Sequence, residues 1–250
     1  MSYTIAVCGK GGTGKTTVAA LVIRWLLQHH GQGSILAVDG DPNTNLDAAL
    51  GVKAQGSMVA IIDDISKNPQ QIPSGMTKDR FLEYQIQDSL AEAGGFDLLV
   101  MGRPEGPGCY CFANNLLRTL IAKLSKSYSY IVIDNEAGME HLSRRTARKI
   151  DLLFIISDYS LIGLRSAKRI LDLTKELEIS VKDTRLVINS VPEAGNQLKE
   201  EIHRMGISLA GTIPEDEKVL KLSLAGGNIR SLPEDSKAVK AVNKICEAIK

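Results

Sequence analysis

The sequence predicts a single α/β domain with a doubly wound, mainly parallel β-sheet. First, its 250 residues fit one large domain. Second, short apolar runs alternate with longer segments of helical period, which implies right-handed crossovers that place helices on both faces of a sheet. Third, several runs are apolar on consecutive residues, as is typical of strands buried on both faces. We therefore expect residues 1–250 to form one domain.

Seven apolar runs are the candidate strands, and they cover residues 4–8, 34–38, 97–101, 130–133, 152–156, 185–188 and 209–213. Helical spacing of apolar residues predicts helices over residues 18–27, 116–124 and 164–177. A further helix, over residues 238–249, has lysines opposite its apolar positions and is expected to cover the sheet. Two stretches break the pattern. Residues 63–75 should form a loop or short helices, and the Gly- and Pro-rich residues 102–111 a rigid irregular loop.

The composition is that of a globular protein with a full core, with 44% hydrophobic and 24% charged residues. The formal net charge is +1, so the protein has no large positive charge that would attract nucleic acid or an anionic membrane. Neither is an expected partner. The N-terminus lacks a charged leader region, and the longest apolar run, residues 152–156, is far shorter than the ~20 residues that span a bilayer. We expect a cytoplasmic protein whose four cysteines are thiols or metal ligands.

Residues 9–16 read Gly-Lys-Gly-Gly-Thr-Gly-Lys-Thr and match G-x-x-x-x-G-K-[ST] between a predicted strand and a predicted helix, as in the P-loop NTPase fold. Glycines let the backbone wrap phosphates, and the helix N-terminus adds N–H donors. Lys15 should reach the β- and γ-phosphates of ATP, and the Thr16 hydroxyl should bind Mg²⁺. A glycine-rich turn without function is the alternative. The other phosphate-binding positions are expected to be Gly9, Gly11, Gly12, Thr13, Gly14 and Thr17.

Acidic residues end two of the predicted strands, where side chains face the ligand crevice of such a fold. Asp134 is the expected partner of Mg²⁺, through water, and Gly138 is placed to offer a backbone N–H to the γ-phosphate. Asp39 is expected to support Mg²⁺ or its waters, and Asp41 to position the attacking water. A free aspartate has a pKa of about 3.9 and is a poor base at neutral pH, so the role of Asp41 is orientation. An Asp-x-Asp-Pro stretch that only forms a turn is the alternative.

Lys10 and the Gly-Gly-Thr-Gly-Lys-Thr that follows it resemble the deviant P-loop of the MinD/ParA/nitrogenase-iron-protein class of ATPases. The resemblance continues through residues 39–41, 134–138, 187–189 and 211–216. It implies a homodimer in which Lys10 crosses the interface to the partner's phosphates and acts in hydrolysis. It also implies that Asn189 and the segment of Pro214 contact adenine. Independently, an Asn amide can pair with both N6 and N7 of the base, because it donates and accepts. A turn asparagine satisfied by its own loop is the alternative.

Cys109 and Cys111 form a C-x-C pair. Residues i and i+2 face the same side of a strand, and thiols in a turn or at a helix start can likewise converge on one ion. A closed tetrahedral site usually takes four ligands, and a two-fold dimer would supply the second pair if this loop lies near the axis. A disulfide across one residue would be strained, and two incidental loop cysteines remain an alternative. Cys8 and Cys246 are expected to be small core residues.

The C-x-C pair, together with the Gly-Met-Glu-His-Leu-Ser-Arg-Arg-Thr of residues 138–146, resembles the CooC/AcsF-type maturation ATPases. That group helps to insert nickel into carbon monoxide dehydrogenase or acetyl-CoA synthase. The resemblance implies that Cys109 and Cys111 bind nickel, and zinc in vitro, across the dimer, and that a nickel enzyme is the client. Affinity order alone does not choose nickel over zinc or copper. Glu140 and His141 are expected to begin a helix, not to bind metal.

Three other functions compete with this interpretation. A MinD/ParA-like positioning ATPase would share the nucleotide chemistry. An iron–sulfur carrier or redox ATPase could hold a [4Fe–4S] cluster on four cysteines at a dimer axis. A small-molecule kinase is disfavoured, because the sequence contains no separate acceptor or lid motif. The metal, the client and the trigger of dimerisation are left open by the sequence.

Overall fold

The computed structural model describes residues 2–30, 35–103, 110–136, 149–177, 179–192 and 198–249. Within them one sheet has the strand order β3-β4-β2-β5-β1-β6-β7-β8. Neighbouring strands are parallel except for the antiparallel β3–β4 pair, which confirms the predicted sheet. The strands are β1 (Tyr3–Gly9), β2 (Ile35–Gly40), β3 (Ala91–Ala93), β4 (Phe96–Val100), β5 (Tyr130–Asn135), β6 (Ile150–Asp158), β7 (Val181–Val191) and β8 (Ser208–Pro214).

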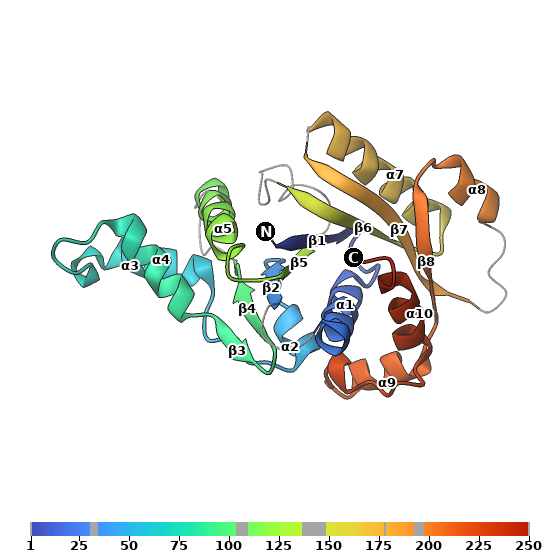
Figure 1. Ribbon diagram of the computed structural model, residues 1–250, viewed down its shortest axis with the longest axis horizontal. Coiled ribbons are helices and arrows are strands. Elements are labelled where there is room, and N and C mark those ends of the chain that lie inside the picture. Colours follow the sequence, from blue (N-terminus) through green and yellow to red (C-terminus); the bar gives the residue numbers. More distant parts are fainter. Residues whose placement is uncertain are drawn as a thin grey trace.

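Helices cover both faces of this sheet. They are α1 (Lys15–His29), α2 (Leu46–Leu50), α3 (Met58–Lys67), α4 (Lys78–Asp88), α5 (Tyr110–Leu124), α7 (Leu161–Glu176), α8 (Lys199–Arg204), α9 (Glu217–Leu224) and α10 (Lys237–Cys246), with short 3₁₀ helices η1 (Pro69–Gln71) and η2 (Ile229–Ser231). Figure 1 shows α1 and α10 on one side of the sheet and α5 and α7 on the other.

Consecutive apolar residues in the central strands are needed because both faces are covered. In β1, Ile5 and Val7 belong to the core beneath α1 and α10, whereas Ala6 and Cys8 belong to the core beneath α5 and α7. All four are fully buried. Alternate strand residues point to opposite faces, so an unbroken apolar run fills two cores at once. Cys246 of α10 is also fully buried, and the prediction of two core cysteines is confirmed.

The segment between β2 and β4 carries a projecting pair of helices, α3 and α4 (Figure 1). The pair has a small core of its own, centred on Ile65, Phe81 and Leu82. Residues 63–75 were predicted to form a loop or short helices. They contain the end of α3 and the short helix η1, in agreement with the second alternative. Helix α4 was not predicted, because Phe81 and Leu82 serve this satellite core and only Ile86 reaches the core of the main sheet.

The structure tests the predictions for the last helix and for the loop before α5. Helix α10 covers the sheet as predicted, with Val239, Val242 and Ile245 buried. The irregular loop predicted for residues 102–111 ends too late, since α5 begins at Tyr110. The last helix-breaking residue before α5 is Gly108, and nothing after it interrupts a helix.

Within the described ranges, every helix is too short or too polar to cross a bilayer.

Candidate functional site

The connection from β1 to α1 wraps back on itself through two left-handed glycines, Gly12 at φ 80° and Gly14 at φ 87°. A side chain at Gly14 would also collide with Asn189, because its Cβ would lie 2.2 Å from Nδ2 of that residue. At Gly9 a Cβ would lie 2.4 Å from the carbonyl oxygen of Ile156. Glycine is therefore required at these positions by backbone conformation and by space. The loop has the form that the phosphate-binding motif predicts.

The two lysines of this loop have different surroundings. Lys15 is only 7% exposed, and its Nζ lies 3.4 Å from the carbonyl oxygen of Lys10, to which it donates. Its charge is thus directed into the loop, where phosphates are expected. Lys10 itself is exposed, and its predicted role on the partner's phosphates stays a prediction.

Thr16 and Asp134 meet at the carboxyl edge of the sheet. The Thr16 hydroxyl donates a hydrogen bond of 2.6 Å to Oδ2 of Asp134. The other carboxylate oxygen, Oδ1, is buried and has no hydrogen-bond partner among the described residues. A buried oxygen without a partner is costly, and a hard dication such as Mg²⁺ takes hydroxyl and carboxylate oxygens as ligands. The donor set therefore fits Mg²⁺, and these two residues would hold it.

Asp39 lies beside Asp134, because the two are register partners in β2 and β5. Burial raises the pKa of Asp134 to about 7, a rise that the Thr16 hydroxyl opposes and the charge of Asp39 reinforces. Burial likewise raises the pKa of Asp39 to about 6, against the N–H groups of Leu46 and Asp41. The backbone N–H of Leu46 donates to Oδ2 of Asp39 at 2.9 Å, and that of Asp41 donates to Oδ1 at 3.1 Å. Asp39 thus shapes the turn after β2, and its support of Mg²⁺ stays a prediction.

Asp134→Asn is expected to raise the melting temperature of the nucleotide-free protein at pH 8. The folded pKa of about 7 exceeds the ordinary 3.8, so the native state binds more protons than the unfolded state between roughly pH 4 and 7. The free energy of unfolding therefore falls as the pH rises through this window. Asparagine carries no charge and avoids the loss. The gain should be a few degrees, since about 1 kcal/mol shifts Tm by about 2–4 °C in a domain of this size.

Thermal melts at pH 5 and pH 8, with and without Mg²⁺-ATP, measure this effect. The stabilisation of the wild type by Mg²⁺ should also be missing in Asp134→Asn. Equal melting-temperature differences between the two proteins at both pH values would contradict the assignment of the buried charge.

Asp41 belongs to the turn that follows β2. Its Oδ1 accepts hydrogen bonds from the backbone N–H of Asn43 at 2.9 Å and from Nδ2 of Asn43 at 3.0 Å. The carboxylate is thus held at the same edge of the sheet as Asp39. Its role in positioning the attacking water stays a prediction.

Asn189, near the end of β7, is fastened to the P-loop. Its Nδ2 donates to the carbonyl oxygen of Thr13 at 2.9 Å, across 176 residues of sequence. One amide hydrogen is therefore used on the loop. The second hydrogen and the amide oxygen are the groups with which Asn189 would contact a base.

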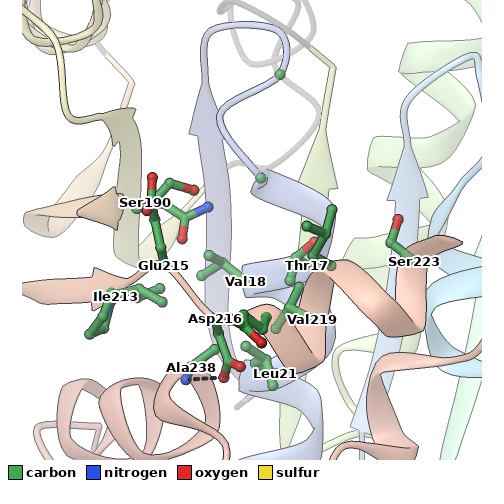
Figure 2. A pocket seen from close by; sticks show the side chains of 16 residues that line it. Thr17, Val18, Leu21, Ser190, Ile213, Glu215, Asp216, Val219, Ser223 and Ala238 are labelled. Atoms are coloured by element: carbon green, nitrogen blue, oxygen red, sulfur yellow. Dashed lines mark hydrogen bonds between the residues drawn. The ribbon is translucent and has the colours of Figure 1, made fainter. Parts of the chain in front are cut away.

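A cavity of about 670 Å³ opens beside the P-loop and is lined in part by Asn189 and Pro214. Figure 2 shows Thr17, Val18 and Leu21 of α1 along one wall. A mostly apolar cavity of this size with a few convergent polar groups is typical of small-ligand sites. Its position next to the phosphate loop is where the base and ribose of a nucleotide would lie.

Helix α9, which lies outside the sequence motifs, contributes further residues to the lining of the cavity. Val219, Leu220 and Ser223 of α9 line the cavity. A usable signal was present, because Asp216 is a helix N-cap residue placed just before apolar residues at helical spacing. Helix α9 was not among the predicted helices, because its 8 residues make it shorter than any segment that was predicted as a helix.

Two predicted site residues, Cys109 and Gly138, lie outside the described part of the structure. So do Glu140 and His141, which were expected to begin a helix. Of Cys111 only the backbone, in the first turn of α5, is described. Among the described residues, no three or more His, Cys, Asp or Glu side chains gather as a metal site.

Comparison with known families and proteins agrees with this geometry. Residues 4–229 match the CobQ/CobB/MinD/ParA nucleotide binding domain family. An uncharacterized ATP-binding protein of Methanocaldococcus jannaschii is 43% identical, over 98% of this chain and 97% of that protein. The carbon monoxide dehydrogenase accessory protein CooC of Rhodospirillum rubrum is 34% identical, over 70% of each chain.

Solved structures are similar in fold. A ParA family ATPase of Chlorobium tepidum superposes with a TM-score of 0.75 at 22% identity, covering 100% of this chain and 99% of that one. The septum site-determining protein MinD of Pyrococcus horikoshii, complexed with Mg-ADP, superposes with a TM-score of 0.70 at 20% identity and covers 100% and 96% of the chains. At these identities the likeness concerns the fold alone.

Proposed function

The chain belongs to the CobQ/CobB/MinD/ParA family of nucleotide-binding domains, and on this premise we propose that it is a nickel metallochaperone driven by ATP. Two copies bind Mg²⁺-ATP and hold one nickel ion between them on Cys109 and Cys111 of each chain. The dimer then assists insertion of the ion into carbon monoxide dehydrogenase or acetyl-CoA synthase.

The observation that carries this proposal is the likeness to CooC, which is 34% identical over 70% of the chain. The C-x-C pair supports it, because in the sequence the pair follows β4 and spans the start of α5. The segment that contains the pair leaves the carboxyl end of β4 and enters α5. The carboxyl ends of β1, β2 and β5 carry the P-loop and the acidic residues of the nucleotide site. Parallel strands bring these ends to one edge of the sheet, so the cysteine segment starts from the edge at which ATP is bound.

Backbone hydrogen bonds connect the residue that follows β4, Met101, with the nucleotide site. The N–H of Met101 donates to the carbonyl oxygen of Asp39 at 2.9 Å, and the N–H of Val59 donates to the carbonyl oxygen of Met101 at 3.0 Å. The side chain of Asp39 also accepts a hydrogen bond from the backbone N–H of Asp41. A movement of the Asp39–Asp41 turn on loss of the γ-phosphate would therefore reach the end of β4 directly. This is a route by which hydrolysis could alter the metal site.

The residues of the site support a phosphoryl-transfer mechanism. Water attacks the γ-phosphorus, the bond to the β–γ bridging oxygen breaks, and ADP and inorganic phosphate leave. Asp41 orients the water, Lys15 neutralises charge on the β- and γ-phosphates, and Lys10 of the partner subunit adds a second positive charge. Bound Mg²⁺ supplies further neutralisation of the phosphate oxygens. Thr16 and Asp134 would hold that ion.

Dimerisation completes the metal site. Each chain offers two thiolates, and a closed tetrahedral centre takes four soft ligands. Both thiols must lose their protons to bind, so metal binding should weaken as the pH falls. Nickel is the cargo of this reaction and leaves with the client.

Anaerobic titration with nickel, with and without Mg²⁺-ATP, tests the proposal. Elemental analysis should find one nickel ion for two chains, with zinc binding in a parallel titration. A brown protein with broad visible absorption after anaerobic purification would instead indicate an iron–sulfur cluster on the same cysteines. Absence of stoichiometric nickel or zinc would contradict the proposal and favour a positioning ATPase.

A further inference from the structure

Asp216 joins two helices through one carboxylate. It is the N-cap of α9, where its Oδ1 accepts the backbone N–H of Lys218 at 2.8 Å. Its Oδ2 accepts the Ser236 hydroxyl at 2.6 Å and the backbone N–H of Ala238 at 3.0 Å. Ser236 and Ala238 form the start of α10. Partial burial alone would raise the pKa of Asp216, but these donors hold it below its usual range. A single side chain thus satisfies free N–H groups at the start of both helices.

The two helices differ in how firmly they are held. Helix α10 packs on α1 and the sheet and buries Val239, Val242 and Ile245. Helix α9 buries none of its residues, and its Leu220 and Leu224 are 60% and 80% exposed. Only Val219 and Leu222 of α9 are partly buried against the core, so hydrophobic burial holds α9 less firmly than α10, and the bonds at its first turn become correspondingly important.

The loosely held helix is also a wall of the nucleotide cavity. Val219 of α9 faces the cavity opposite Val18 and Leu21 of α1, and Asp216 lies between α9 and α10 in the same view (Figure 2). The dashed line in the figure is its bond to the N–H of Ala238. Helix α1 begins at the P-loop, so the width of the cavity is set by the distance between a fixed helix and one that Asp216 tethers.

We propose that Asp216 is a positioning residue for the nucleotide base, which it serves by tying the α9 wall of the cavity to α10. The inference rests on the assignment of this cavity to ATP and does not depend on nickel. Asp216 does not act on the phosphates, since its three partners belong to α9 and to the start of α10. Its removal should therefore weaken recognition of the base while leaving recognition of the phosphates in place.

Asp216→Ala is expected to weaken Mg²⁺-ATP binding about tenfold, the loss that corresponds to a missing double cap. Binding of Mg²⁺-tripolyphosphate, which has no base or ribose, should change by less than about twofold. Asp216→Asn keeps one acceptor oxygen and can cap only one of the two helices, so its affinity for ATP should fall between those of the wild type and the alanine variant. Isothermal titration with both ligands gives the ratio of affinities for each protein.

Asp235→Ala is the matched control. Its carboxylate lies in the same region and contacts Lys218, but through the side-chain Nζ at 2.5 Å and not through the backbone. The control should bind both ligands as the wild type does. An equal loss of ATP and tripolyphosphate binding in both Asp216 variants would mean general damage to the site, and unchanged ATP binding would mean no positioning role. Either result overturns the proposal, and failure of the wild type to bind either ligand overturns the nucleotide assignment itself.

Discussion

Replacing Cys109 and Cys111 together with alanine is expected to abolish stoichiometric nickel binding and the dimerisation that nickel induces. The pair supplies every soft ligand that one chain gives to the proposed centre, and thiolates are the ligands that bind nickel and zinc in such sites. Loss of both from each chain removes all four ligands of the dimer. ATP binding should stay within about twofold of the wild type, because the P-loop contacts of Lys15 and Thr16 are unchanged.

Elemental analysis after anaerobic loading and desalting measures the metal. Cys246→Ala is the matched control, because it removes a thiol that is fully buried in α10 and whose pKa burial raises well above its ordinary range. That variant should bind nickel like the wild type. One nickel ion still bound per two chains of the double variant would show that the metal site lies elsewhere.

Lys15→Ala should have the opposite pattern, with loss of ATP hydrolysis and retention of metal binding. Lys15 is the buried lysine of the P-loop, and its ammonium group already donates to the carbonyl oxygen of Lys10. Charge-assisted bonds to phosphate are among the strong ones, and removing one preorganised donor to a developing charge costs roughly 10²–10³ in rate. ATP affinity should fall roughly 10–100-fold as well.

Phosphate release and equilibrium binding of ATP measure the two effects, and Lys67→Ala, which removes an exposed lysine at the end of α3, is the control. Hydrolysis by Lys15→Ala at more than about a tenth of the wild-type rate would contradict the assignment of this lysine. Loss of nickel binding in the same variant would mean that nucleotide must bind before the metal site can form.

The sheet could be predicted because its physical signal is local. A strand such as β6, buried on both faces over Leu152–Ile156, must be apolar at these consecutive positions, and glycines such as Gly14 are required where the backbone is left-handed. The P-loop and the strand-end acids follow from the same reasoning. The strand limits were less certain, since β7 runs over Val181–Val191 and its first half is too polar to show the pattern.

Features that depend on contacts distant in sequence could not be predicted. The bond from Asn189 to Thr13 joins β7 to the P-loop, and the missing partner of Asp134 Oδ1 is a property of its whole surroundings. The double cap by Asp216 depends on the start of α10, 20 residues farther along the chain. Sequence indicates which groups can bond, but only the fold decides which of them meet.

The central claim is that each chain carries half of a metal centre, and the solution mass measured by light scattering tests it most directly. With Mg²⁺-ATP and nickel both present under anaerobic conditions, the protein should have twice the 27.1 kDa mass of one chain. It should return toward that single-chain mass when nickel and nucleotide are removed by chelator and desalting. A mass of one chain in the presence of both ligands would contradict the claim.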